Sequence, residues 1–270
     1  MIFSLKNISL EKGKKEILSQ VNLDIKPNRL TMIAGRNGAG KSSLLRILSG
    51  EEKQYQGSAL FVNNELKTCK PESLATQRAV LPQHPNAGFS FTAKEIISLG
   101  AFPYRVASDI VDQHIDELAN KLGVYHLLNR PLTNLSGGEQ QKIHVGRVML
   151  QSLLSNELHK VMLLDEPANN LDLTYQHEIY EMMKSSNSTV VAIVHDINMA
   201  VRYADDLIFL SQGKVIANGE VNDCLDPQLL LSVLGHPVTV LHHPCSDCPL
   251  IVPQINQIKH HGKKRSLINQ

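Results

Sequence analysis

Three glycines, a lysine and a hydroxyl are gathered in the eight residues "GRNGAGKS", from Gly35 to Ser42. Glycines let the backbone curl so that successive N–H groups point inward at anionic oxygens. A helix expected from Lys41 onward adds its positive end, the Lys41 ammonium reaches the outer phosphates, and the Ser42 hydroxyl suits Mg²⁺. The pattern G-x-x-x-x-G-K-[ST] lies between a predicted strand and a predicted helix, so a phosphate loop is favoured over a turn without a ligand. The candidate nucleotide contacts are Gly35, Arg36, Asn37, Gly38, Ala39, Gly40, Lys41, Ser42 and Ser43.

Two carboxylates follow a short apolar run in "VMLLDEP", which indicates a buried strand and its end. Asp165 would hold the hydration shell of Mg²⁺, and Glu166 would face the terminal phosphate and polarise a water. An acid at a strand end before proline is common, so this pattern is weak by itself. The phosphate loop upstream makes the catalytic interpretation the favoured one.

Two further polar residues are candidates only in that context. His195 follows the apolar run "VVAIV", where a partly buried structural histidine is the commoner outcome. Beside a terminal phosphate, its imidazole could hydrogen-bond the transferring group and the attacking water. Gln83, in "VLPQHP", stands between the core and a helical block, from which it could reach the metal. With Ser42 and Asp165 it completes the predicted Mg²⁺ contacts.

A glycine pair begins another expected helix in "LSGGEQQKIH". Ser136 and Glu139 predict a capping box, which contributes on the order of 1 kcal/mol. Neither explains Gly137 and Gly138, because glycine is a poor choice in a first helical turn. Bare N–H groups at a helix start form an anion site, and the chain already has its phosphate loop. We therefore expect Ser136, Gly137 and Gly138 to meet the terminal phosphate of an ATP held by a second copy, in a head-to-tail dimer.

The bulk properties are those of an ordinary globular protein. The 270 residues are 42% hydrophobic and 20% charged, and the net charge of +1 gives no argument for a nucleic-acid partner. Aromatic residues make up 4% and tryptophan is absent, which disfavours base stacking. No apolar stretch is long enough to cross a bilayer, and the N-terminus lacks a secretory cleavage pattern. We therefore expect a cytoplasmic protein, and its four cysteines fit a reducing compartment.

The elements that must position these residues alternate between strands and helices. Strands are expected over residues 2–10, 17–25, 30–35, 160–167 and 188–196, and a hairpin over 206–219 with its turn at Gln212-Gly213. Helices are expected over residues 41–50, 92–100 and 108–123, and after the glycine pair. Past His236 the pattern weakens. The predicted fold class is α/β, a core with an N-terminal antiparallel β subdomain and an inserted helical subdomain at about 84–150.

The motifs, taken in order, resemble one family. The phosphate loop, Gln83, "LSGGEQQ", "LLDEP", "NNLD" and His195 are similar to the nucleotide-binding subunit of an ABC transporter over about residues 2–241. The resemblance implies a P-loop NTPase of the ABC type with a RecA-like core, ATP and Mg²⁺ as ligands, and two ATP molecules enclosed by a homodimer. It also implies that Glu166 activates the water, that His195 is a switch, and that Gln83 couples ATP to membrane subunits. The domain is expected to end at residue 241, and residues 242–270 form a partly disordered C-terminal extension.

Longer stretches narrow the resemblance. "RAVLPQHPNAGFSFTAKEIISLG" and "VVAIVHDINMAVRYADDLIFLSQGKVIANG" are similar to the ATPases of metal-chelate importers, above all those of haemin import. This implies an ATP-hydrolysing subunit at the cytoplasmic face of the inner membrane, two transmembrane permease subunits and a periplasmic solute-binding protein. An iron-siderophore or cobalamin importer is the alternative. A soluble ABC ATPase acting on DNA or ribosomes is disfavoured, because such proteins usually carry a long coiled-coil insertion or tandem units. Glu166 and His195 argue against a regulatory module without turnover.

Two positions depart from the family pattern. Lys12 stands where an aromatic residue usually stacks on adenine, and its aliphatic part is the expected substitute. Asn169 and Asn170 replace the more usual Ser-Ala before Leu171 and Asp172, so the coupling through that loop is expected to differ in detail.

The C-terminal segment offers a weaker signal. "LHHPCSDCPL" contains Cys245 and Cys248 beside two histidines, which could bind Zn²⁺. A second ligand pair at the usual spacing is missing, so a surface turn with reduced thiols is the favoured interpretation. The basic residues that follow favour a solvated tail over contact with anionic lipid; they are Lys259, Lys263, Lys264 and Arg265.

Overall fold

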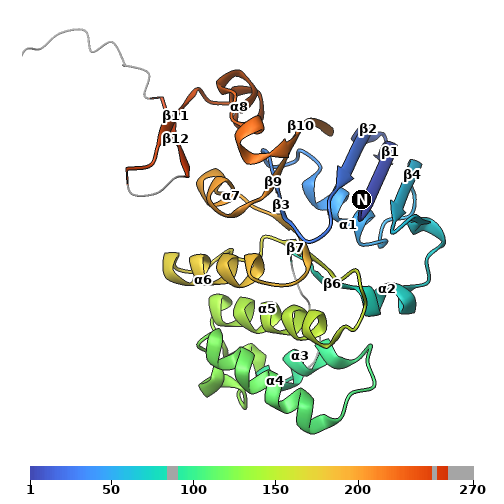
Figure 1. Cartoon of the computed structure of the whole chain (residues 1–270), viewed down its shortest axis with the longest axis vertical. Coiled ribbons are helices and arrows are strands. Elements are labelled where there is room, and N and C mark those ends of the chain that lie inside the picture. The colour runs from blue at the N-terminus through green and yellow to red at the C-terminus, as the bar shows by residue number, and fades with distance from the viewer. Residues whose placement is uncertain (84–90, 245–247, 255–270) are drawn as a thin grey trace, which may run out of the picture.

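A six-stranded sheet forms the centre of the protein, and a computed structural model describes residues 1–83, 91–244 and 248–254 (Figure 1). In sheet order its strands are β10 (Lys214–Glu220), β9 (Asp206–Ser211), β3 (Leu30–Ala34), β8 (Thr189–Ile193), β7 (Val161–Asp165) and β6 (Arg78–Leu81). All neighbours are parallel except β10, which pairs with β9 through the predicted hairpin turn. β3, β7 and β8 are buried at every residue, as continuous apolar runs require when both faces of a parallel sheet are covered. The predicted α/β class is confirmed.

A second, antiparallel sheet forms the N-terminal subdomain. Its strands are β2 (Lys15–Ile25), β1 (Phe3–Lys12), β4 (Gln56–Phe61) and β5 (Asn64–Glu65). Helix α1 (Lys41–Leu48) shares one hydrophobic cluster with this sheet and with β3, β7 and β8. The rings of Phe3 and Phe61 lie 5.0 Å apart in that cluster. The start of α1, where the phosphate loop ends, is therefore held between the two sheets.

Helices cover the opposite side and form the inserted block. The block consists of α3 (Ala93–Ser98), α4 (Ser108–Lys121) and α5 (Gly137–Leu154), which lie together at one end of the molecule (Figure 1). The remaining helices are α2 (Pro71–Gln77), α6 (Leu173–Lys184), α7 (Ile197–Tyr203) and α8 (Pro227–Leu234). α5 joins the block to the central sheet, because Arg147 donates to the Val80 carbonyl of β6 at 2.9 Å. It runs four residues beyond the expected boundary at 150, and the expected start at 84 lies outside the described residues.

The C-terminal part contains a hairpin where the sequence pattern weakens. Strands β11 (Val238–His242) and β12 (Pro249–Pro253) pair with each other, so the expected boundary at residue 241 falls inside a strand. Asn198 of α7 pairs with Ile251 like a neighbouring strand: its amide donates to the Ile251 carbonyl at 3.1 Å and accepts from the Ile251 N–H at 2.7 Å. Cys245 and residues 255–270, with the four basic residues named above, lie outside the described parts.

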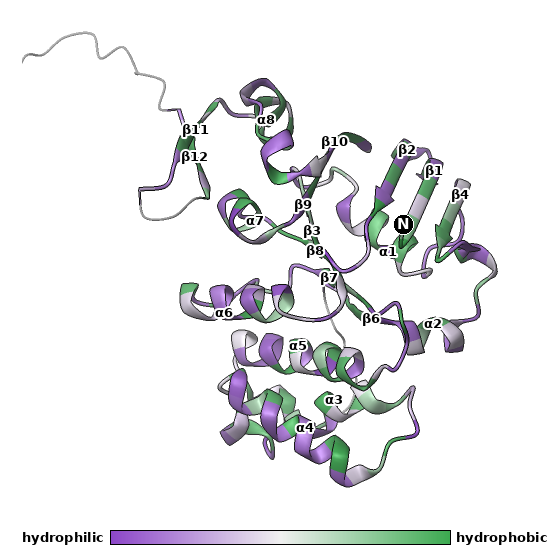
Figure 2. Ribbon diagram, viewed as in Figure 1, coloured by the Kyte–Doolittle hydropathy of each residue, from purple (hydrophilic) through white to green (hydrophobic). Residues whose placement is uncertain are grey.

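Hydropathy follows these layers. Figure 2 shows the strands of the central sheet mainly in green, whereas helices such as α4 and α6 carry purple as well as green residues, as amphipathic covers do. Over residues 1–83, 91–244 and 248–254, no helix has both the length and the apolar character needed to cross a membrane.

Candidate nucleotide-binding site

The phosphate loop has the backbone geometry that its glycines predict. Gly40 is the N-cap of α1 and has a φ of 104°, and Gly38 has a φ of 79°. A Cβ at Gly40 would lie 2.8 Å from Leu18 Cδ2 and 2.9 Å from the Ile17 carbonyl oxygen. Glycine is required there both by the left-handed conformation and by the approach of β2.

Lys41 places its ammonium inside this loop. The side chain is buried, and Nζ donates to the carbonyls of Gly35 at 2.8 Å and Arg36 at 3.2 Å. Burial lowers the pKa of Lys41, and the nearby carboxylates of Glu166 and Asp165 act in the opposite direction. The first N–H groups of α1 have no carbonyl partner within the helix, so cation and amide donors converge on one concave turn. Such an arrangement suits the binding of phosphate oxygens.

Asp165 supplies a buried oxygen that lacks a partner. It is the last residue of β7, and its Oδ1 makes no hydrogen bond to any described residue. Burial raises the pKa of Asp165, while a hydrogen bond from Ser42 opposes the rise. A carboxylate oxygen and a hydroxyl in contact form a hard oxygen donor set, which suits Mg²⁺. The residues present therefore fit the metal that the sequence predicts.

Glu166 is the centre of a hydrogen-bond network. It follows β7 with a φ of 54°, which turns its side chain away from the strand direction. Its Oε1 accepts from Gln83 Nε2 at 3.2 Å and lies 2.5 Å from His195 Nε2, and its Oε2 accepts from Asn169 Nδ2 at 2.9 Å. His195 follows β8, which is the parallel neighbour of β7. The register therefore brings the side chains of Glu166 and His195 together at the carboxyl ends of these two strands. Three residues predicted from separate motifs are thus in direct contact.

An open cleft of about 390 Å³ unites these groups. It is lined by Lys15, Ile17, Asn37, Gly38, Gly40, Lys41, Ser42, Ser43, Gln83, Glu166 and His195. Lys15 and Ile17 were not among the sequence candidates. The pairing of Lys12 with Lys15 across the β1–β2 turn brings the start of β2 over the loop, while Lys12 itself forms an ion pair with Glu52 at 3.8 Å. A short polar turn between two β-like runs is the only sequence signal for this wall.

The glycine pair at the start of α5 is not part of this cleft. The predicted capping box is present: Glu139 N–H donates to Ser136 Oγ at 3.3 Å, and Ser136 N–H donates to Glu139 Oε2 at 2.7 Å. A Cβ at Gly138 would lie 3.1 Å from the Asn170 carbonyl oxygen, so contacts within the chain explain that glycine. A Cβ at Gly137 would meet no atom of the described residues within 4 Å. Nothing in the described chain requires a glycine at Gly137.

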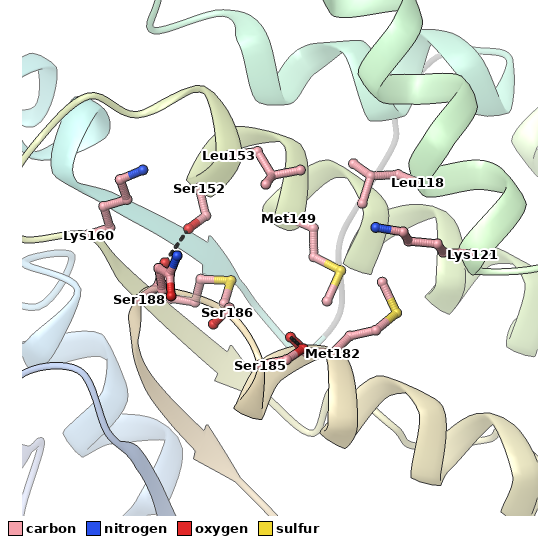
Figure 3. A pocket seen from close by; sticks show the side chains of 12 residues that line it. Leu118, Lys121, Met149, Ser152, Leu153, Lys160, Met182, Ser185, Ser186 and Ser188 are labelled. Atoms are coloured by element: carbon pink, nitrogen blue, oxygen red, sulfur yellow. Dashed lines mark hydrogen bonds between the residues drawn. The ribbon is translucent and has the colours of Figure 1, made fainter.

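A second cavity, of about 300 Å³, lies near the amino ends of β7 and β8, at the opposite end of these strands from Glu166 and His195. Lys160 and Ser188, which precede β7 and β8, are part of its lining, and Figure 3 shows the side chains of Met149 and Met182 around it. Ser152 and Ser188 hydrogen-bond each other at 2.8 Å, and none of the described residues that line the cavity has a carboxylate or an imidazole. These lining residues therefore offer no carboxylate or imidazole as a general base for hydrolysis.

Of the two C-terminal cysteines, Cys245 lies outside the described residues and Cys248 lies within them. Among residues 1–83, 91–244 and 248–254, no group of three or more candidate ligand side chains is found, and Cys69 and Cys224 have free thiols.

A phosphate loop between β3 and α1, with an acid pair at the end of β7 and a histidine after β8, defines a P-loop nucleoside triphosphatase. The ABC transporter family matches residues 18–169. The hemin import ATP-binding protein of Photobacterium damselae subsp. damselae is 39% identical over 249 residues, covering 91% of this chain and 94% of that protein. The corresponding protein of Vibrio parahaemolyticus is 35% identical and covers 93% and 97%. The chain therefore belongs to the ABC transporter family, as an ATP-binding subunit and ATPase.

Solved structures agree with this assignment. A bacterial ABC transporter cassette solved as a dimer superposes with a TM-score of 0.71 and 26% identity, covering 81% of this chain and 98% of that one. A metal-chelate type ABC transporter in an inward-facing conformation gives a TM-score of 0.73 at 24% identity, with coverage of 94% and 98%. At 24% identity, the comparison with the metal-chelate type transporter shows a shared fold alone. The RecA-like core, the antiparallel β subdomain and the inserted helical subdomain are confirmed.

Proposed function

We propose that this ATPase energises the import of haemin, and that the cleft between β2, α1 and β7 is its catalytic site. The contact of Glu166 with both Gln83 and His195, above the phosphate loop, is the observation that carries the site assignment. The relatives that bear the name of hemin import proteins support the cargo, because they align over more than nine-tenths of the chain.

Binding uses the loop from Gly35 to Ser43. The N–H groups at the start of α1 and the Lys41 ammonium hold the phosphates. Before ATP binds, the carbonyls of Gly35 and Arg36 accept hydrogen bonds from Lys41 and keep its ammonium in place. Ser42, Asp165 and Gln83 would hold Mg²⁺, which supplies charge neutralisation at the phosphates when bound. Lys15 and Ile17 line the side of the cleft reached by β2, where their methylenes can cover an adenine face.

Hydrolysis needs a base positioned on a water. Glu166 is 9% exposed, so few solvent molecules compete for its carboxylate, and it accepts a proton from the attacking water. His195, 46% exposed, can leave Glu166 and hydrogen-bond the terminal phosphate. Gln83 precedes the helical block in the chain, and its side chain donates a hydrogen bond to Glu166. A change at the catalytic carboxylate can therefore be passed to that block through Gln83.

Two copies complete the site. Ser136 and Gly137 are exposed, and a Cβ at Gly137 would meet no described residue within 4 Å, which leaves room for the terminal phosphate of a nucleotide bound by a second copy. The resulting homodimer, two permease subunits and a periplasmic solute-binding protein make up the proposed importer, at the cytoplasmic face of the inner membrane. Phe102 is 88% exposed in the loop after α3, and an apolar side chain so exposed suits a permease contact. The ATPase domain spans residues 1–241 in this proposal, with 242–270 as its extension.

Deletion of the gene in its own host tests the cargo. Growth on haemin as the iron source should be lost and restored by the wild-type gene, whereas growth on ferrous iron should be unaffected. Growth on haemin that persists, with loss of siderophore or cobalamin uptake, would assign one of the alternative chelates instead.

A further inference from the structure

The turn after Glu166 contains an amide that reaches back to the carboxylate. Asn169 Nδ2 donates to Glu166 Oε2 at 2.9 Å, on the oxygen that neither Gln83 nor His195 contacts. Among the described residues, Asn169 is the one whose side chain donates a hydrogen bond to Glu166 Oε2. Asn169 is one of the residues at which the sequence departs from the pattern that the resemblance implies.

The orientation of the Asn169 amide is set by the backbone. Its Oδ1 accepts from the Asn170 N–H at 3.0 Å, which leaves Nδ2 to face Glu166. The Asn169 N–H also donates to the Glu166 carbonyl at 3.2 Å, closing the turn. Asn170 has a φ of 60°, a conformation that asparagine tolerates well. The donor is thus aimed by local geometry rather than by a flexible side chain.

The turn itself is held by α5. Gln141 Nε2 donates to the carbonyls of Glu166 at 3.1 Å and Pro167 at 3.0 Å. The Asn170 carbonyl and the Leu171 side chain pack against Gly138 at the start of the same helix. Asn169 therefore projects from a segment fixed on both sides of it.

We propose that Asn169 is a positioning residue for Glu166, an inference that rests on the proposed role of Glu166 as the base. With Asn169 in place, both oxygens of the carboxylate are held and its plane is fixed. Without Asn169, the carboxylate is held through Oε1 alone, and it turns away when His195 leaves for the phosphate. Such a loss affects the chemical step and leaves nucleotide binding intact, because Asn169 does not line the nucleotide cleft.

Two substitutions separate this role from a structural one. Asn169→Ala should lower kcat about tenfold, the effect expected when a hydrogen bond to a charged group is removed, with the Kd for ATP within twofold of the parent value. Asn169→Asp retains the shape and the bond to the Asn170 N–H, but it turns an acceptor toward Glu166. It should therefore lower kcat at saturating ATP further than alanine does. Asn156→Asp, the same change in an exposed loop, is the control and should match the parent.

A double-mutant cycle decides whether Asn169 acts through Glu166. In a Glu166→Gln background, measured by single turnover, Asn169→Ala should change the residual rate by less than twofold. The same tenfold loss in both backgrounds, or an unchanged kcat in Asn169→Ala and Asn169→Asp, would overturn the proposal. Unchanged turnover in Glu166→Gln alone would instead remove the proposed base, and the positioning role with it. Thermal unfolding identifies any variant that fails to fold, and the remaining variant then carries the test.

Discussion

The substitution Gly137→Ala should have opposite effects on the stability of the isolated chain and on ATP-driven dimerisation. Within the part of the chain that the structure describes, the added methyl group meets no atom within 4 Å, and Gly137 does not have a positive φ, so the isolated chain accepts alanine without strain. Alanine is preferred over glycine in a helix by up to about 1 kcal/mol. The nucleotide-free variant should therefore be as stable as the parent or melt up to about 2–4 °C higher.

The same methyl group has the opposite effect on a closed dimer. If the Gly137 backbone approaches a phosphate held by a second copy, the extra carbon is forced against it, at a cost of roughly 1–3 kcal/mol per site for overpacking. Two equivalent sites double this figure to roughly 2–6 kcal/mol, so ATP-driven dimerisation should weaken by at least about thirtyfold.

The assay is light scattering with ATP in a Glu166→Gln background, which retains the nucleotide, together with equilibrium binding of ATP to the monomer. Gly138→Ala is the matched comparison, because its methyl would press on the Asn170 carbonyl of the same chain and should lower stability. Ser136→Arg should block closure while sparing ATP binding. Dimerisation of Gly137→Ala and of Ser136→Arg that matches the parent in this background, together with parental ATP hydrolysis by both variants when Glu166 is present, would refute the shared site.

Two further predictions concern single side chains. Glu166→Gln should bind ATP normally and hydrolyse it about 10²–10⁴-fold more slowly in a phosphate-release assay, because a general base is removed; normal turnover would assign the base elsewhere. His144, on α5, is 5% exposed, and burial lowers its pKa to about 4 from 6.5, with Arg147 acting in the same direction. A lowered histidine pKa favours the neutral form in the fold, so this contribution to stability is complete above pH 6.5 and is lost as the pH falls from 6.5 toward 4. Between pH 7.5 and 5 the free energy of unfolding should fall by roughly 2 kcal/mol more in the parent than in His144→Leu, as measured by urea denaturation, and parallel pH curves would contradict the buried neutral histidine.

The sequence alone determined the features that depend on a few neighbouring residues. Gly38 and Gly40 adopt positive φ because the loop must curl within eight residues. The bonds of the capping box join residues three apart, so Ser136 and Glu139 were enough to predict it. Gln212 and Gly213 have φ values of 49° and 77°, as a tight turn between two strands requires. In each case the constraint and the residues that satisfy it are adjacent in the chain.

Only the tertiary structure decided which distant residues meet. The Lys15 and Ile17 wall depends on how β2 crosses the phosphate loop, and nothing in their residue types indicates it. Asn169 was visible as a departure from the family pattern, but its bond to Glu166 depends on a turn braced by α5. The C-terminal hairpin escaped sequence analysis because its partner, Asn198, lies 53 residues from Ile251. A contact across such a separation is determined by how whole helices and strands pack against each other. Short-range sequence patterns and propensities carry no information about that packing.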